Sequence, residues 1–146
     1  MDALTIDRDP LHLQPAASKI ALEWDRRCHE SGLLSRFTET WRSQARQASL
    51  GPNSTSVKLG YHCVGLAWDF GIFEKNSAGV WIMVQNGDDP RYAAAGKIAV
   101  DLGCKYGIHL LSGQVDHDHI EYHPGFTLAQ FLATAQGQAA LKGPQA

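Results

Sequence analysis

Residues 61–70 read Tyr-His-Cys-Val-Gly-Leu-Ala-Trp-Asp-Phe, and the expected fold is built outward from them. Aromatic and branched residues from Leu66 to Phe73 predict a β-strand. Successive side chains of a strand point to opposite faces, so one face carries Leu66, Trp68, Phe70 and Ile72, and the other carries Ala67, Asp69, Gly71 and Phe73. Asp69 has the small residues Ala67 and Gly71 as neighbours on its face. The pattern predicts one face that packs and one face with room for an ion.

A second polar segment, residues 116–123, reads Asp-His-Asp-His-Ile-Glu-Tyr-His. We predict a strand from His119 to His123, in which Ile120 and Tyr122 share one face and His119, Glu121 and His123 share the other. The two segments together supply four groups that suit a metal site: His62, Asp69, Asp116 and His119. A catalytic zinc site has three such protein ligands and one open position for water. Four groups therefore fit three ligands and one base, although spacing alone leaves ordinary hydrogen-bonded side chains open and makes His117 and His123 rival ligands.

Composition narrows the class of protein. The chain has 146 residues, of which 44% are hydrophobic and 19% charged, as expected for one globular domain spanning 1–146. A net charge of -2 offers no electrostatic case for nucleic acid as a partner. No apolar run reaches the roughly 20 residues of a membrane span, so membrane insertion is not expected, and we see no signal peptide at the N-terminus. Three widely spaced cysteines predict free thiols in a reducing compartment.

The remaining segments predict an α+β domain with a small antiparallel sheet flanked by helices. Residues 1–15 are expected to form an N-terminal arm, residues 105–115 an irregular connection and residues 137–146 a flexible tail. Proline at the start and glycine beyond the end mark the helix that begins at Pro90. The expected helices are 16–30, 42–50, 90–102 and 128–135, and the further strands are 35–41 and 79–85, the latter in a hairpin with the strand at 66–73.

Three sequence patterns together resemble a known family. The pattern Ser-x-His-x-x-Gly-x-Ala-x-Asp is matched at His62, Gly65, Ala67 and Asp69. A pattern of Asp or Glu, two residues, His, an apolar residue and Glu or Gln is matched at Asp116, His119, Ile120 and Glu121. An upstream aromatic-Arg-Ser…Gln-x-x-Leu pattern is matched at Trp41, Arg42, Ser43, Gln47 and Leu50. The chain thereby resembles the zinc D-Ala-D-Ala carboxypeptidase and L-alanyl-D-glutamate endopeptidase family, over about residues 20 to 135.

The resemblance implies a role for each matched residue. It implies a hedgehog- and D-Ala-D-Ala-peptidase-like zinc fold, with one Zn²⁺ per chain held by His62, Asp69 and His119. Asp116 would be the general base, and Arg42, with Gln47, would lie in the substrate pocket. Without the resemblance, Arg42 is more simply explained as part of a surface salt bridge.

Three further residues have a less direct case. Tyr106 and His109 are candidate substrate-binding residues because they lie on the segment just before the base and could line the cleft. Glu121 is either a partner that orients a ligand imidazole or a solvated strand residue. The family's Ser two positions before the first ligand is Gly60 here, and its usual Pro before the second His is Asp118. These departures bear on substrate preference more than on the metal.

By resemblance, the expected activity is a zinc metallopeptidase that hydrolyses peptidoglycan stem peptides. We expect a monomeric L-alanyl-D-glutamate endopeptidase of the phage or prophage endolysin type, which would accumulate in the host cytoplasm and reach the cell wall at lysis. The alternatives are a D,D-carboxypeptidase or dipeptidase, for which export would be expected, and a non-catalytic zinc domain that binds wall peptide. Asp116 favours catalysis, since a domain that only binds has no need of a base.

Overall fold

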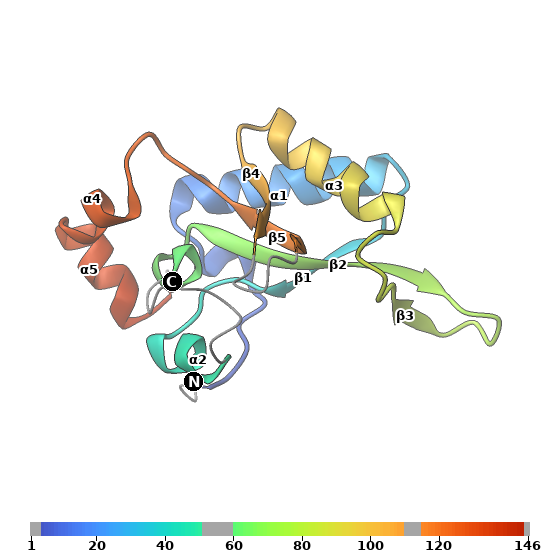
Figure 1. Ribbon diagram of the computed structural model, residues 1–146, viewed down its shortest axis with the longest axis horizontal. Helices are drawn as coiled ribbons and strands as arrows, with labels where there is room; N and C mark the ends of the chain where they lie inside the picture. Colours follow the sequence, from blue (N-terminus) through green and yellow to red (C-terminus); the bar gives the residue numbers. More distant parts are fainter. Residues whose placement is uncertain (1–3, 51–59, 110–114, 145–146) are drawn as a thin grey trace.

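The computed structural model describes residues 4–50, 60–109 and 115–144, and over these it has an α+β fold with one open antiparallel sheet. The strands are β1 (Ser35–Glu39), β2 (Ala67–Lys75), β3 (Trp81–Met83), β4 (Lys105–His109) and β5 (Val115–Glu121). Their order is β1-β2-β5-β4, and β3 pairs with the far end of β2. The long strand β2 is therefore the centre of the sheet (Figure 1).

Helices cover the two faces of this sheet unequally. The described helices are α1 (Pro15–Glu30), α2 (Gln44–Ser49), α3 (Pro90–Asp101), α4 (Leu128–Leu132) and α5 (Ala135–Lys142), with the short 3-10 helices η1 (Pro10–His12) and η2 (Tyr61–Val64). Helices α1 and α3 lie together on one side of the sheet, whereas the short α2 lies on the other (Figure 1). Among the residues that the structure describes, α2 is the helix on this second face, which we call the open face. None of the described helices has the length and apolarity needed to cross a membrane.

The face beneath α1 and α3 is the hydrophobic core, as the alternation in β2 predicts. Trp68, Phe70 and Ile72 are fully buried there. Trp24 of α1 packs edge-on against Phe70, with ring centroids 5.0 Å apart, and its indole nitrogen donates to the carbonyl of Ala95 in α3, 2.9 Å away. One tryptophan thus joins both helices to the sheet, which leaves the Asp69 side of β2 for the polar groups.

Several local predictions are confirmed. The helix at 16–30 and the β2–β3 hairpin are present, and the Asn76 side chain accepts hydrogen bonds from the backbone N–H groups of Ala78 and Val80 in the hairpin turn. The helix predicted to begin at Pro90 is α3, and the structure adds that Asp89 caps it and that Thr127 caps α4 in a reciprocal capping box with Gln130. These signals depend on neighbouring residues alone, so sequence identifies them well.

Residues 105–115 were predicted to be irregular, and that prediction is wrong for 105–109 and 115, while residues 110–114 lie outside the described part of the structure. Residues 105–109 form β4, and β5 begins at Val115 rather than His119. The two strands pair antiparallel with a register shift between Tyr106 and Ile108. The pairing of the two strands makes residues 105–109 extended. The register shift interrupts the alternation of side chains between the two faces of the sheet, so the sequence alone does not indicate a strand here.

The C-terminal segment also differs from its prediction. The single helix expected at 128–135 is two helices, because Thr134 interrupts it, accepts from the Gly137 N–H and caps α5. The flexible tail expected from residue 137 is helical to Lys142, and Ala140 is buried. A Cβ at position 137 would lie 2.0 Å from the carbonyl oxygen of Phe131. Glycine therefore permits the close turn between the two helices.

The N-terminal arm packs against the body of the protein. The backbone N–H of Thr40 donates to the Asp7 carbonyl at 2.7 Å, and the N–H of Gln14 donates to the Gly65 carbonyl at 2.9 Å. Leu13 is buried in the core. The arm is thus anchored at the end of β1 and beside the turn that carries His62.

Candidate metal centre

Three of the predicted ligands converge on one point of the open face. The Nε2 atom of His62 lies 3.1 Å from Asp69 Oδ1 and 3.2 Å from His119 Nδ1, and His119 Nδ1 lies 3.0 Å from Asp69 Oδ1. Asp69 and His119 stand opposite each other in the antiparallel register of β2 and β5. Both histidines are buried, and Asp69 is partly exposed. The three atoms form a nearly equilateral triangle that can hold a metal ion.

The size of this triangle suits a small tetrahedral ion. Zinc lies about 2.0–2.2 Å from His nitrogen and carboxylate oxygen, so tetrahedral ligand atoms are about 3.3 Å apart. The observed edges are 3.0 to 3.2 Å. Two imidazoles and one carboxylate are also an ordinary donor set for zinc. The residues present therefore fit a single ion of this type.

Hydrogen bonds set which nitrogen of each histidine faces the triangle. His62 Nδ1 lies 2.7 Å from the buried carbonyl oxygen of Thr40, an acceptor, so Nδ1 carries the proton and Nε2 is free to ligate. His119 Nε2 lies 3.0 Å from Glu121 Oε1, which leaves Nδ1 as the ligand atom. This is the usual way in which a second partner orients a ligand imidazole. Glu121 is buried and bonded to His119, so it is not a solvated strand residue, and its role in orienting a ligand stays a prediction.

A tight turn before β2 delivers His62 to this position. His62 lies in η2, which ends at Gly65 in the left-handed region with φ = 71°. A Cβ on Gly65 would lie 3.0 Å from the backbone nitrogen of Gln14 in the N-terminal arm. The glycine of the motif is therefore needed twice, for its backbone conformation and for the close approach of the arm.

Charges around Asp69 keep it ionised. Burial opposes ionisation, but His62 and His119 outweigh it and hold the pKa of Asp69 well below its usual range. Burial likewise opposes the protonation of His119, but Asp69 and Glu121 outweigh it and raise its pKa to about 10 in the metal-free protein. Glu121 has a lowered pKa because the nearby imidazoles outweigh its burial. The raised pKa favours a proton on His119 in the metal-free protein, and a metal ion would take that proton's place.

Arg42 is buried directly behind the carboxylate of Asp69. Its Nη2 donates to Asp69 Oδ2 at 3.2 Å and to Glu39 Oε1 at 2.8 Å, while its Nη1 donates to Gln47 Oε1 at 2.9 Å. Glu39 also accepts from Arg46 Nε at 3.1 Å. Arg42 therefore holds the outer oxygen of Asp69, a candidate ligand, and its burial excludes the simple surface salt bridge. Gln47 is 5% exposed and supports Arg42; substrate contacts of both residues stay predictions.

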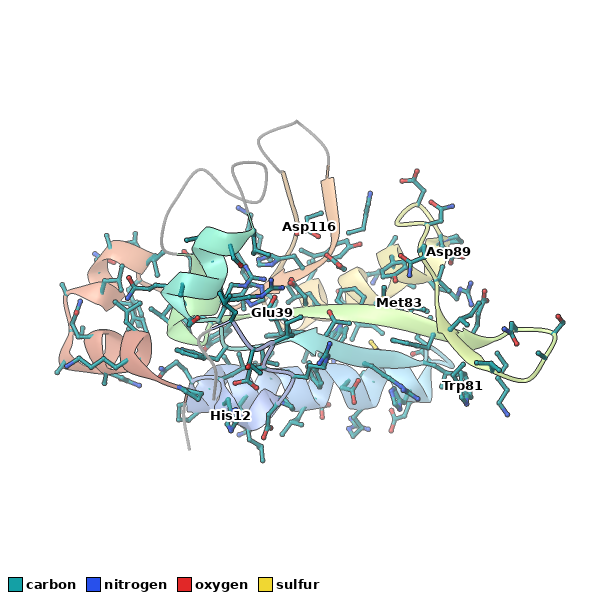
Figure 2. The ribbon with its side chains drawn as sticks, turned by 90° about the horizontal axis from the view of Figure 1, so that it is seen from below. His12, Glu39, Trp81, Met83, Asp89 and Asp116 are labelled. Atoms are coloured by element: carbon teal, nitrogen blue, oxygen red, sulfur yellow. The ribbon has the colours of Figure 1, made fainter. Side chains whose placement is uncertain are left out.

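The candidate base, Asp116, lies on β5 near the triangle. A carboxylate oxygen of Asp116 is within 4.8 Å of one on Asp69 and one on Asp118. Burial, and then the Asp116 carboxylate, raise the pKa of Asp118 to about 9. The Asp118 N–H donates to Asp116 Oδ1 at 3.3 Å. Figure 2, which views the molecule from the side of α2, labels Asp116 and Glu39.

The other predicted residues lie at or beyond the edges of this site. Tyr106 packs on the core face against Gly96 of α3, and its hydroxyl donates to the His117 carbonyl, so it does not face the metal ligands. His109 ends β4, and its side chain lies outside the described part of the structure. Of the rival ligands, His117 pairs with Asp88, and His123 bonds to Glu121 at 2.7 Å without reaching the triangle.

Sequence reasoning missed three residues that the structure brings into the site. Glu39 and Thr40 hold Arg42 and His62, and Asp118 contacts the candidate base. A polar Thr-Glu-Thr run directly before Trp41 and Arg42 is the signal that could have pointed to the first two. Cys63, beside His62, is fully buried. Among the described residues it belongs to neither group that could bind a metal, which are His62, Asp69 and His119 and also Asp69, Asp116 and Asp118.

A cavity of about 620 Å³ adjoins the triangle at Asp69. Its lining runs from Asp69, Asp118 and Glu39 beside the triangle to Phe73 and Met83 on β2 and β3. Comparison with known proteins adds no assignment: no protein-family model matches the chain, and a search of curated proteins finds none that matches it. The chemistry of the site must therefore be argued from its geometry and from the sequence patterns.

Proposed function

We propose that this protein is a zinc-dependent peptidase. The observation that carries the proposal is the triangle of His62, Asp69 and His119, with tautomers set for metal binding and the Asp116 carboxylate beside it. A zinc ion bound there would lower the pKa of a water molecule to about 7 and polarise a scissile carbonyl. An open cavity next to the ligands supplies space for a peptide.

The protein's own groups then have distinct tasks. The Asp116 carboxylate accepts a proton from the attacking water and passes it to the nitrogen of the departing amine. Arg42 keeps Asp69 ionised and oriented through its bond to Oδ2. Glu121 and the Thr40 carbonyl hold the two imidazoles, so the site is organised before substrate arrives.

For the substrate, we propose peptidoglycan stem peptides, and the L-alanyl-D-glutamate bond in particular. The support is the combination of three sequence patterns, in the right order, with a triangle formed by the residues of two of them. On this proposal the fold is of the hedgehog and D-Ala-D-Ala-peptidase type, and the protein is a monomeric phage or prophage endolysin that passes from the host cytoplasm to the wall. A D,D-carboxypeptidase is the alternative with the same chemistry.

A non-catalytic zinc domain that binds wall peptide is the alternative without chemistry. Asp116 distinguishes the two, because it is not among the three ligand atoms of the triangle and a domain that only binds has no need of a base. We expect Asp116→Asn to retain zinc at one equivalent and the wild-type thermal unfolding temperature while losing cleavage at least about 100-fold, the range typical of a lost general base. Asp101→Asn, an exposed carboxylate on α3, is the matched control.

The test is digestion of purified peptidoglycan, with the released peptides identified by mass spectrometry. Chelator-sensitive release of fragments newly ended at L-Ala and D-Glu supports the endopeptidase. Release of free D-Ala alone would assign the carboxypeptidase instead. Zinc binding without cleavage by the wild type would leave the binding domain, and failure to bind zinc would refute the proposal as a whole.

A further inference from the structure

The cavity beside the triangle is lined both by carboxylates, which are bonded to neighbouring groups, and by arginines, two of which form no ion pair with the described residues. Asp69, Asp118 and Glu39 line it near the triangle, and each is engaged there: Asp69 with the histidines and Arg42, Asp118 with Asp116, and Glu39 with Arg42 and Arg46. Two further arginines, Arg8 and Arg36, also line the cavity. Neither of them forms an ion pair with any residue in the described ranges 4–50, 60–109 and 115–144, and both are exposed.

Arg36 is held in position over the cavity. It stands on β1 opposite Gly71 of β2, and its guanidinium carbon lies 4.9 Å from the centre of the Phe73 ring. A cation placed over an aromatic ring is attracted to it, and the guanidinium group keeps its N–H edges available for an acid while it stacks. Gly71 has no side chain to fill the space, and Met83 lies across it, with Sδ 2.6 Å from where a Cβ would be.

The register of the sheet gives the distance along β2 from Arg36 to the candidate ligand Asp69. Gly71, its partner in register, is two residues along β2 from the ligand Asp69. At about 3.4 Å per residue of strand, Arg36 therefore stands about 7 Å along the sheet from Asp69. An extended peptide advances about 3.3–3.6 Å per residue, so 7 Å corresponds to one or two residues of substrate.

Arg8 reaches the same cavity from the N-terminal arm. The arm is anchored beside the end of β1, since the Asp7 carbonyl accepts from both the N–H and the hydroxyl of Thr40. Asp7 is buried, and its neighbours on either side, Ile6 and Arg8, line the cavity. The arm thus contributes a second cation that no carboxylate of the described residues neutralises.

We infer that Arg36 and Arg8 form a subsite for a free carboxylate carried by the substrate within two residues of the scissile bond. This inference rests on the proposed peptidase function and goes beyond it, because it predicts selection for an acid over the corresponding amide. In a stem peptide, D-glutamate is joined through its side-chain carboxyl, so its α-carboxylate is free beside the L-alanyl bond. Amidation of that group would remove the charge that the arginines bind.

The experiment compares two synthetic peptides, L-Ala-γ-D-Glu-L-Lys and the same peptide with the α-carboxylate amidated. With zinc-loaded wild type, we expect kcat/KM for the acid to exceed that for the amide about tenfold, as a charged hydrogen-bonding contact provides. Arg36→Gln should raise KM for the acid alone and bring the ratio close to one, Arg36→Lys should restore part of it, and Arg8→Gln should act in the same direction. Arg26→Gln, on α1 at the opposite face of the sheet, should leave the ratio unchanged.

Binding separates this inference from the proposed function. Isothermal titration of the acid and the amide into zinc-loaded Asp116→Asn measures the preference without cleavage. If Asp116→Asn binds the acid more tightly than the amide, and adding Arg36→Gln abolishes this preference, the subsite is supported. That conclusion holds even if the wild type cuts neither peptide, because the lack of cleavage would refute only the peptidase function. Equal affinity for acid and amide, or equal losses for both peptides in Arg36→Gln and Arg8→Gln, would overturn the subsite and leave the peptidase untouched.

Discussion

Replacing Glu121 by Gln tests whether Glu121 orients His119 in the candidate metal centre. Glu121 is 8% exposed, and its Oε1 lies 3.0 Å from His119 Nε2. Glutamine keeps the size and one acceptor oxygen but removes the charge. A buried hydrogen bond to a charged group contributes about 1.5–3 kcal/mol and a neutral one about 0.5–1.5 kcal/mol. The expected loss is therefore about 1–2 kcal/mol, or a 5- to 30-fold rise in the zinc dissociation constant, in line with orienting partners of other metal sites.

The assay is competition for zinc against a chromophoric chelator at pH 7.5. Glu30→Gln, which changes an exposed glutamate at the end of α1, is the matched control and should bind zinc as the wild type does. Thermal unfolding of the metal-free variants separates loss of the site from loss of the fold. Equal zinc dissociation constants for Glu121→Gln and wild type would refute the reasoning, because His119 would then not depend on Glu121 for its orientation.

Three further predictions concern the fold and its titrating groups. Gly65→Ala should lower the free energy of unfolding by at least about 1–2 kcal/mol, measured with urea, because alanine at φ = 71° is strained and its Cβ would crowd Gln14; an unchanged midpoint would contradict this. Burial raises the pKa of Cys28 to about 12 and of Cys104 to about 11, so both thiols should resist iodoacetamide at pH 8 until the protein is unfolded; rapid labelling of the native protein would contradict it. The partners of His119 raise its pKa to about 10, so its stabilising contribution to the metal-free protein is complete below about pH 6.5 and is lost as pH rises toward 10. Zinc uptake at pH 7.5 should therefore release about one proton, which calorimetry in buffers of different ionisation enthalpy measures. Zinc uptake without proton release would contradict this prediction.

The sequence was most informative where a property depends on neighbouring residues. The alternation around Asp69 correctly separated a packed face from a polar face, and Pro90 correctly marked the start of a helix. The three residues of the candidate metal centre were also identifiable, since their side-chain chemistry and spacing follow from two short segments. Thr134 shows the limit: its role as a cap inside an apparent single helix depends on the turn that Gly137 permits.

By itself, then, the sequence determined the donor set of the candidate metal centre and the faces of its central strand. Only the tertiary structure decided that His62, Asp69 and His119 meet, because the register of β2 against β5 is set by backbone hydrogen bonds between distant segments. A slip of one residue would turn His119 to the opposite face. The same long-range packing turned Tyr106 toward the core and placed Arg8 and Arg36 in the lining of one cavity, which no local pattern records.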